Sequence, residues 1–492
     1  MQRRKVSITQ ILILNVVLVL IIFIPIHDSS YYWSSGNQNG SSLEEQISDL
    51  EQVTEITTRG TIHNYMVNGF NNFLNFSDFL TQYNIANETE KPNIINNYLE
   101  WQETTGGGFP AIQNDTNVVF IYYNSTLTIN SCTLVGDFTA WNEISMTRLA
   151  EGVNFFYREY SFEPTSRIDY VFVINGVEQV DPRNPNQAPL DFGYSSSELA
   201  MPKFVQPTEI LYRSDIPHGT VATLQPPWEN PKVQVYLPPN YDPKKTYPTL
   251  YTGDGSYYIT LMSVVNILDN LIADQRIEPI IAVFIDPIDF DPLSNDTQTT
   301  YARILWYKCN PEYLTFLDKL VKYIDETYAT NHSSYARAHL GFSISGLASA
   351  YVVIERPETF KLMACQSGSF RVGEEFGIME KYSNAPASLD LKTWFSIGTY
   401  ENNNNFNVPM VEYTQSMAAI CSEKWPTEVV YIHECHSFGA WRHVLDDMLE
   451  FFFPYQIDPS TTASAETSMP IIISLIVFPL MAIVLLYFRK KS

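Results

Sequence analysis

Between Pro202 and Tyr455, short apolar runs alternate with segments whose apolar residues recur at helical spacing. Strands that are apolar throughout are typical of a parallel sheet covered on both faces, because both of their sides are buried. The helices between them supply the crossovers that parallel strands need. The alternation therefore predicts an α/β domain over residues 202–457. The strand candidates are VQVYLP, YPTLYTG, PIIAVFIDP, ARAHLGFS, KLMACQSGS, TWFSIG and TEVVYIHEC, and the helices include YLTFLDKLVKYIDETY and LASAYVVIE.

One of these strands runs into GFSISG, which nearly matches the G-x-S-x-G pattern of a nucleophile elbow. An elbow is a sharp turn between a strand and a helix that holds a serine in strained backbone geometry. Gly341 occupies the first glycine position, whereas Ser345 stands at the second and Gly346 comes one step late. Because Ser345 adds only one hydroxymethyl group, the fold can still form, and Ser343 is the predicted nucleophile.

A serine needs a general base, and in this kind of domain the catalytic residues follow in the order serine, acid, histidine. The strand TWFSIG runs into Glu401, and the strand TEVVYIHEC runs into His436. Both residues would emerge at the carboxyl ends of their strands, where α/β sites are built. The predicted triad is Ser343, Glu401 and His436.

The segment HECHSFGAWRH raises the alternative of a metal site, since it holds His433, His436 and His443. Zinc-binding helices of the H-E-x-x-H type place two histidines four apart on one face. Here the first two are three apart, and His433 continues a strand pattern. We therefore predict no metal, with His433 and His443 in packing or surface roles.

The pattern changes ahead of the α/β domain. Residues 28–105 include Asn-rich segments with helical periodicity and predict a small helical region. Residues 106–201 alternate apolar and polar side chains in short runs with frequent turns, which predicts a β-sandwich of about immunoglobulin size.

The N-terminus suggests targeting to a membrane. An apolar run at residues 11–26 follows Arg3, Arg4 and Lys5. Residues 1–27 are therefore predicted to be a signal peptide or an uncleaved anchor.

The C-terminus gives a stronger signal. Residues 469–488 are uncharged and long enough to cross a bilayer, and the basic tail at residues 489–492 follows them directly. Residues 458–468 are rich in Ser and Thr and predict a stalk. By the positive-inside bias, both basic ends are cytoplasmic and the chain between them is extracellular.

Charge and sequons agree with that location. The chain has 30 basic and 54 acidic residues, and all the acidic ones lie between the two basic ends, which disfavours nucleic acid as a partner. Sequons for N-glycosylation occur at Asn39, Asn75, Asn87, Asn114, Asn124, Asn295 and Asn331.

Five cysteines allow at most two disulfides within the chain, and their spacing specifies no pairing. Cys132 and Cys365 fall in apolar strand patterns, for which buried free thiols are the simplest interpretation.

Several stretches together resemble the esterase family that includes enterochelin esterase and esterase D: VQVYLPPNYDPKKTYPTLYTGDGSYY, NILDNLIADQRIEPIIAVFIDP, GFSISGLASAYVVIERPETF, CQSGSF and HSFGAWRHVLDDML. In enterochelin esterases the catalytic histidine is followed five positions later by Trp-Arg, matched here by His436, Trp441 and Arg442. The resemblance implies an α/β-hydrolase fold with Ser343 as nucleophile, His436 as base and Glu401 as orienting acid.

The same resemblance implies an oxyanion site in the turn GDGSYY. The backbone N–H groups of Ile344 and Ser256 are the implied donors, with Gly255 as the alternative to Ser256. Tyr257 and Trp441 are the implied substrate-binding residues. Arg303 either joins them by binding a substrate carboxylate or pairs with a surface acid.

The stretch LVGDFTAWNEISMTRLAEGVNFFYREY resembles the early-set immunoglobulin-like domain that precedes some esterases and glycogen-active enzymes. In the second group this domain sometimes binds glucan. Trp141 in the GDFTAW turn could serve that purpose or simply pack the domain.

The expected protein is thus a membrane-tethered, extracellular serine esterase that needs no metal or organic cofactor. Its expected substrate is a small-molecule or glycan ester, such as an acylated carbohydrate or a siderophore ester. Two alternatives remain at this point: an acyltransferase, and a non-catalytic binding protein that retains the fold.

Overall fold

The computed structural model describes residues 73–189, 194–225, 228, 230–289, 291, 297–401 and 409–456. Within these ranges, no helix has the length and apolar character needed to cross a membrane. The predicted N-terminal segment (1–27), stalk (458–468), membrane span (469–488) and tail (489–492) lie outside the described residues.

Two helices begin the described chain: α3 (Phe76–Ile85) and α4 (Lys91–Thr104). The Asn75 side chain caps α3 by accepting from the Asp78 N–H. Aromatic side chains join the helix to the strands that follow, with the rings of Phe76 and Tyr157 centred 4.9 Å apart.

The strands between Ala111 and Ala200 form two antiparallel sheets. The first has the order β1-β2-β6-β5, and the second has the order β4-β3-β7-β10-β9, with β8 paired to β7. Apolar side chains from both sheets share one core, including Phe120, Phe156 and Phe172. The strands are β1 (Ala111–Ile112), β2 (Asn117–Tyr123), β3 (Cys132–Gly136), β4 (Ile144–Ser145), β5 (Thr147–Arg148), β6 (Phe155–Ser161), β7 (Arg167–Ile174), β8 (Val177–Gln179), β9 (Gln187–Pro189) and β10 (Ser195–Ala200).

We call this two-sheet part the sandwich domain. Its likeness to the early-set immunoglobulin class stays a prediction.

The remaining strands make one sheet of eight in the order β11-β12-β14-β13-β15-β16-β17-β18. From β13 to β18 neighbouring strands are parallel, while β12 runs antiparallel to both β11 and β14. All seven predicted strands are present, and β11 is added at the edge. The strands are β11 (Thr220–Thr223), β12 (Val233–Leu237), β13 (Thr249–Gly253), β14 (Ile281–Ile285), β15 (Arg337–Phe342), β16 (Leu362–Gln366), β17 (Lys392–Gly398) and β18 (Thr427–Ile432).

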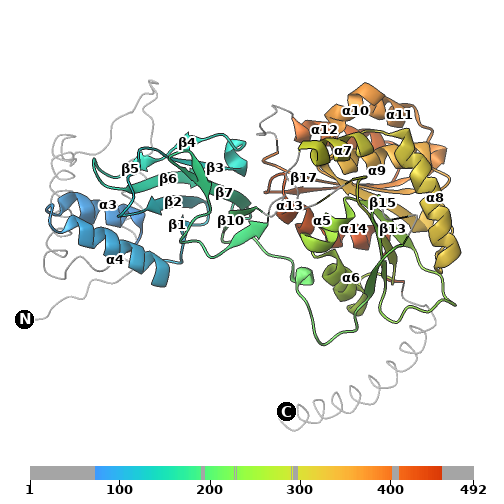
Figure 1. Cartoon of the computed structure of the whole chain (residues 1–492), viewed down its shortest axis with the longest axis horizontal. Coiled ribbons are helices and arrows are strands. Elements are labelled where there is room, and N and C mark those ends of the chain that lie inside the picture. Colours follow the sequence, from blue (N-terminus) through green and yellow to red (C-terminus); the bar gives the residue numbers. More distant parts are fainter. Residues whose placement is uncertain are drawn as a thin grey trace, which may run out of the picture. The chain divides into compact units, whose positions relative to one another are not determined.

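Helices cover both faces of this sheet (Figure 1). On one face lie α7 (Thr297–Tyr307), α8 (Pro311–Thr327), α9 (Ser343–Glu355), α10 (Phe370–Gly373), α11 (Ile378–Asn384) and α12 (Met410–Ser422). On the other lie α5 (Gly255–Thr260), α6 (Val264–Ala273), α13 (Phe438–His443) and α14 (Leu445–Phe452). The inner strands β13, β14, β15, β16 and β17 are almost fully buried, which explains their unbroken apolar runs.

All five cysteines are buried and free. Burial raises the pKa of Cys132, Cys309 and Cys421 to about 12, so these thiols stay protonated at neutral pH. Free thiols were the simplest interpretation for Cys132 and Cys365, and the structure has them at both positions.

Candidate active site

The nucleophile elbow forms at the junction of β15 and α9. Ser343 is the first residue of α9 and has a φ of 53°, the left-handed conformation that is strained for any residue except glycine. Its side chain is only partly buried. The helix that follows leaves the Ile344 N–H in its first turn, where no carbonyl of the same helix can accept it.

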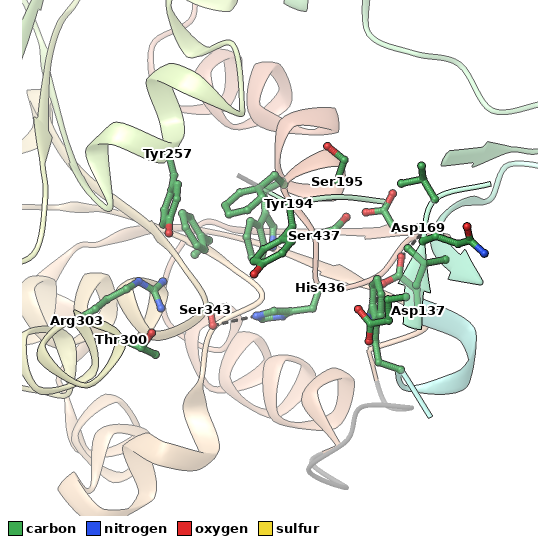
Figure 2. A pocket seen from close by; sticks show the side chains of 18 residues that line it. Asp137, Asp169, Tyr194, Ser195, Tyr257, Thr300, Arg303, Ser343, His436 and Ser437 are labelled. Atoms are coloured by element: carbon green, nitrogen blue, oxygen red, sulfur yellow. Dashed lines mark hydrogen bonds between the residues drawn. The ribbon is translucent and has the colours of Figure 1, made fainter. Parts of the chain in front are cut away.

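The predicted triad is assembled. The Ser343 Oγ lies 2.9 Å from Nε2 of His436 (Figure 2). On the other side of the ring, Nδ1 of His436 lies 2.8 Å from Oε2 of Glu401. The Glu401 side chain is almost fully buried, whereas that of His436 is 38% exposed. A base that faces solvent on one side and a buried acid on the other is what proton transfer from a serine to a substrate requires.

The second oxygen of Glu401 is held by the protein. Its Oε1 accepts from the Ser367 hydroxyl at 2.6 Å and from the Gly398 N–H at 2.9 Å. Ser367 also accepts from Nε1 of Trp441 at 2.9 Å. The Trp441 ring contacts the His436 ring nearly edge-on, with centroids 4.9 Å apart. Ser367 and Trp441 therefore form one support for acid and base.

A cavity of about 590 Å³ opens beside Ser343 and His436. Part of its lining comes from the eight-stranded sheet and its helices, including Tyr257, Thr300 and Arg303, and part from the sandwich domain (Figure 2). The sandwich residues that line it are Asp137, Trp141, Asp169, Val171, Glu178, Gln179 and Val180, together with Tyr194 and Ser195.

The sequence of this region matches a known family model described as "Putative esterase" over residues 227–452. This part of the chain is thus similar to that esterase family. The eight-stranded sheet and its elbow have the α/β-hydrolase fold that the family match and the solved structures share.

Among curated proteins, an endo-1,4-beta-xylanase/feruloyl esterase of Xylanibacter ruminicola is 24% identical over 261 residues, which cover 49% of this chain and 32% of that enzyme. The chain thus matches about a third of the length of that relative. The uncharacterized protein YbbA of Bacillus subtilis is 22% identical over 211 residues, 40% of this chain and 81% of that protein.

Two solved structures have similar folds. The enterobactin esterase FES of Shigella flexneri aligns with a TM-score of 0.57 at 19% identity, covering 71% of this chain and 97% of that one. The ferric enterobactin esterase of Salmonella typhimurium aligns with a TM-score of 0.55 at 16% identity, covering 72% and 98%. At these identities the likeness establishes the fold.

The hydrogen bonds of Ser256 contradict its predicted role as an oxyanion donor. The Ser256 N–H already donates to Oδ1 of Asp286 at 2.7 Å, and the Ser256 hydroxyl lies 2.5 Å from Oδ2 of the same carboxylate. An amide engaged by a buried carboxylate cannot also point at a substrate oxygen. The alternative, Gly255, begins α5 one residue after the end of β13 and stays a prediction.

Arg303 has a partner that the sequence analysis did not name. Its guanidinium forms two hydrogen bonds of 2.7 Å with the two carboxylate oxygens of Asp254, which is fully buried. The expected partner acid was a surface residue, so that detail was wrong. Because Asp254 offsets its charge, Arg303 lines the cavity as half of an ion pair and is a weak receptor for a substrate carboxylate.

Tyr257 and Trp441 both line the cavity, as a substrate-binding role requires. Tyr257 packs on Phe438, with ring centroids 5.0 Å apart. Trp441 stacks on Phe342 at 4.1 Å, and its indole N–H is already engaged by Ser367. Trp441 therefore contacts Ser367 and His436 as well as the cavity, and its substrate-binding role stays a prediction.

The other two histidines of HECHSFGAWRH point to different partners. Nδ1 of His433 lies 2.6 Å from Oγ1 of Thr165, and Nδ1 of His443 bonds to Glu434. Their partners are protein groups, in agreement with the packing roles expected for both.

Sequence analysis missed two groups around the site. One is Ser367, which follows β16 with a φ of 49° and whose stretch CQSGSF was noted only as a family match. The other is Arg167, which shares a face with Asp169 in a strand that is otherwise mostly apolar. An arginine and an aspartate two residues apart in such a strand were an available signal for a buried ion pair.

Proposed function

We propose that this chain is a serine esterase that hydrolyses carboxylic esters through an acyl-enzyme. The observation that carries the proposal is the aligned chain of Ser343, His436 and Glu401, with contacts of 2.9 and 2.8 Å. A nucleophile within hydrogen-bond reach of a base, which is in turn oriented by a buried acid, is the arrangement that activates serine.

In this mechanism Ser343 Oγ attacks the ester carbonyl while Nε2 of His436 takes the serine proton. Glu401 accepts a hydrogen bond from Nδ1–H of His436, which leaves Nε2 as the base, and it stabilises the imidazolium that forms. The imidazolium then gives its proton to the leaving alcohol, which leaves an acyl group on Ser343. Water activated by His436 hydrolyses that acyl group, and the serine is regenerated.

The tetrahedral oxyanion of each step needs donors that are in place beforehand. The Ile344 N–H is one proposed donor and the Gly255 N–H the other. Such donors lower the barrier by about 3 kcal/mol each.

The cavity lining supports an uncharged substrate of the acylated-carbohydrate class over an anionic siderophore ester. The sandwich side of the cavity carries Asp137, Asp169 and Glu178, and Arg303, the one cationic side chain among the described lining residues, is paired with Asp254. Burial, and then the neighbouring Asp169, raise the pKa of Asp137 well above its usual range. Carboxyl groups beside an aromatic ring can bind sugar hydroxyls, and the ring can pack on a sugar face. The exposed Glu178 repels an anion, whereas the charge of Asp169 is offset by Arg167.

Trp141 is the proposed aromatic platform for that sugar. The feruloyl esterase activity in the name of the Xylanibacter ruminicola relative also supports an ester attached to a polysaccharide.

A fluorophosphonate probe on the full-length protein tests the mechanism. Mass spectrometry should find the label on Ser343, and both Ser343→Ala and His436→Ala should prevent labelling. A folded wild-type protein that takes no label would mean that the site is inactive, and the non-catalytic alternative would then replace this proposal.

Matched esters test the substrate class. An acetylated or feruloylated neutral xylo-oligosaccharide should be cleaved with a higher kcat/KM than the same ester on a uronic-acid oligosaccharide. Trp141→Ala should raise KM for the neutral oligosaccharide ester and leave hydrolysis of p-nitrophenyl acetate unchanged. Equal kcat/KM for the neutral and the acidic ester would count against this class.

Extracellular location, N-glycosylation and membrane anchoring through residues 469–488 remain part of the proposal. Their support is the apolar run and the basic tail that follows it. Extraction at alkaline pH tests the anchoring and glycosidase treatment tests the glycosylation, because an anchored glycoprotein stays in the membrane pellet and loses mass on deglycosylation.

A further inference from the structure

The strand that delivers the catalytic base lies at the edge of the sheet. β18 is the last strand in the order, paired only with β17, and its residues are the least buried of the strands from β12 to β18. The loop that carries His436 follows β18 directly, so among the described strands of the eight-stranded sheet it has a neighbour on one side only. Edge positions of this kind are the least constrained part of a sheet.

The sandwich domain fills the other side of this loop. The Arg167 N–H donates to the carbonyl of His433 at 3.2 Å, and Oγ1 of Thr165 lies 2.6 Å from Nδ1 of His433. The start of β7 therefore lies against the backbone that leaves β18.

The side chain of Arg167 contacts the same loop on both sides of the base. Its Nη1 lies 3.4 Å from Oε2 of Glu434 and 3.4 Å from Oγ of Ser437. Glu434 is two residues before His436 and Ser437 is one residue after it. One rigid guanidinium thus spans the turn whose apex is the catalytic base.

The guanidinium itself is fixed from the sandwich side. Its Nε donates to Glu198 at 2.7 Å and its Nη2 to Asp169 at 3.0 Å, and the Arg167 side chain is 1% exposed. Although burial lowers the pKa of Arg167, the carboxylates of Asp169, Glu434 and Glu198 outweigh that effect and keep it charged.

Close packing at Gly439 shows how tightly the loop is held. A Cβ atom at this position would lie 2.2 Å from both Cζ and Nη1 of Arg167. Any side chain at residue 439 would push the guanidinium or the loop aside.

The loop of the catalytic acid touches the sandwich as well. Tyr400 is adjacent to Glu401, its hydroxyl lies 2.8 Å from Oγ of Ser166, and its ring packs edge-on against Phe162. The Tyr400 N–H also donates to the Glu434 carbonyl at 3.3 Å, which links the acid loop to the base loop.

We propose that Arg167 and Tyr400 are positioning residues, through which the sandwich domain holds His436 and Glu401 in register with Ser343. The sandwich domain is then a working part of the catalytic unit, beyond its contribution to the cavity wall. This inference rests on the proposed esterase activity.

The test compares full-length Arg167→Lys and Tyr400→Phe with two controls near the end of β15 that lies away from Ser343. Arg337→Lys changes a buried arginine paired with Asp325 at 2.8 Å, and Tyr335→Phe removes a hydroxyl bonded to Asp390 at 2.7 Å. Both controls precede or begin β15, whereas Ser343 follows its other end.

On p-nitrophenyl acetate, Arg167→Lys should lower kcat about 10- to 100-fold and Tyr400→Phe by a smaller factor of about 3 to 10, because a displaced base loses the attack geometry. KM should change less than about twofold, since neither residue contacts so small a substrate. Labelling of Ser343 by fluorophosphonate should slow in parallel. Arg337→Lys and Tyr335→Phe should keep both rates, even if they unfold at a lower temperature.

Gly439→Ala tests the same inference even if Arg167→Lys fails to fold. Alanine is the better helix former, so a fall in kcat on this change would come from contact with Arg167. Where both variants fold, Gly439→Ala should lower kcat by a smaller factor in the Arg167→Lys background than in the wild-type background.

Folded Arg167→Lys, Tyr400→Phe and Gly439→Ala proteins that all keep kcat within about twofold of wild type would overturn the inference, because a misplaced base costs far more. A wild-type protein that neither hydrolyses esters nor takes the label would instead refute the proposed function, and the inference with it.

Discussion

The hydroxyl of Ser345 lies 2.6 Å from Oδ2 of Asp254, and both side chains are completely buried. The same hydroxyl accepts from the Phe342 N–H at 3.0 Å. The residue that departs from the glycine of the elbow pattern therefore links the nucleophile turn to the residue before Gly255. Gly253 makes the room, because a Cβ atom there would lie 2.8 Å from the Cβ of Ser345.

We expect Ser345→Ala to lower the free energy of unfolding by about 1–3 kcal/mol, because it leaves the Phe342 N–H without its acceptor in a buried site. Fluorophosphonate labelling of Ser343 should persist, since the contacts of Ser343 and His436 do not involve this hydroxyl. Chemical denaturation and labelling of the same sample measure both effects. Loss of labelling in a stable Ser345→Ala protein would show that the hydroxyl has a catalytic role.

Gly253→Ala checks the packing side of this relationship. In the wild-type background the added methyl group should cost about 1–3 kcal/mol of stability through overpacking. With Ser345→Gly present, the cost should fall, because the Ser345 side chain that the methyl group would meet is gone. If Gly253→Ala lowered the stability equally in both backgrounds, the Ser345 side chain would not be what fills the space beside residue 253.

Glu401→Gln should lower kcat by about 10³- to 10⁴-fold on small esters, because an amide can hold the imidazole in the wrong tautomer and cannot stabilise the imidazolium. Glu401→Asp should retain more activity than Glu401→Gln, since the charge remains. Steady-state kinetics on p-nitrophenyl acetate measure the ranking. If the two variants had the same kcat, Glu401 would not be the orienting acid.

Ser367→Ala removes the hydroxyl that donates to Glu401 and accepts from Trp441. Because the acid keeps its bond from Gly398, we expect a partial loss of kcat, on the order of 10-fold, caused by a less well oriented base. Ser422→Ala, a hydroxyl at the far end of α12 that bonds only to a backbone carbonyl, is the matched control and should leave kcat unchanged.

His339 should make stability depend on pH. It is fully buried between the hydroxyls of Tyr313 and Ser349, and burial lowers its pKa to about 3. The unfolded chain protonates this histidine near pH 6.5, so between pH 6.5 and about 3 the unfolded state binds the extra proton. Stability due to this group is therefore complete above pH 6.5 and falls as pH decreases, by up to about 1.4 kcal/mol per pH unit.

Denaturation curves from pH 7 to pH 4 measure this slope. His339→Gln should have a shallower slope than wild type, whatever its absolute stability, while His332→Gln at an exposed position should keep the wild-type slope. An unchanged slope in His339→Gln would mean that other groups account for the acid sensitivity.

The α/β part of the fold was predictable because its signal is local. Each of the seven strand candidates is an apolar run bounded by turn residues, and each forms a strand in the sheet. The elbow was predictable for the same reason, since strand, serine and helix are consecutive in the chain. Glu401 and His436 followed from a general property of parallel sheets, whose strand ends meet at one edge.

The errors arose where a backbone or side-chain group had a distant partner. Ser256 was chosen as an oxyanion donor from its place in a turn, but Asp286, thirty residues further along the chain, takes its N–H. Arg303 was paired with a surface acid, yet its partner is the buried Asp254. Such partners depend on how loops pack, which local patterns do not encode.

The sequence by itself determined the order of strands and helices and the candidates for nucleophile, acid and base, because apolar periodicity and chain order are properties of neighbouring residues. Only the tertiary structure decided which polar groups are hydrogen-bonded within the protein and which can still contact a substrate. It brought Arg167 and Tyr400 to the triad loops and Ser345 to Asp254 through contacts between residues up to 270 positions apart. The physical reason is that a buried polar or charged group must find a partner, and the partner that satisfies it is fixed by packing in three dimensions.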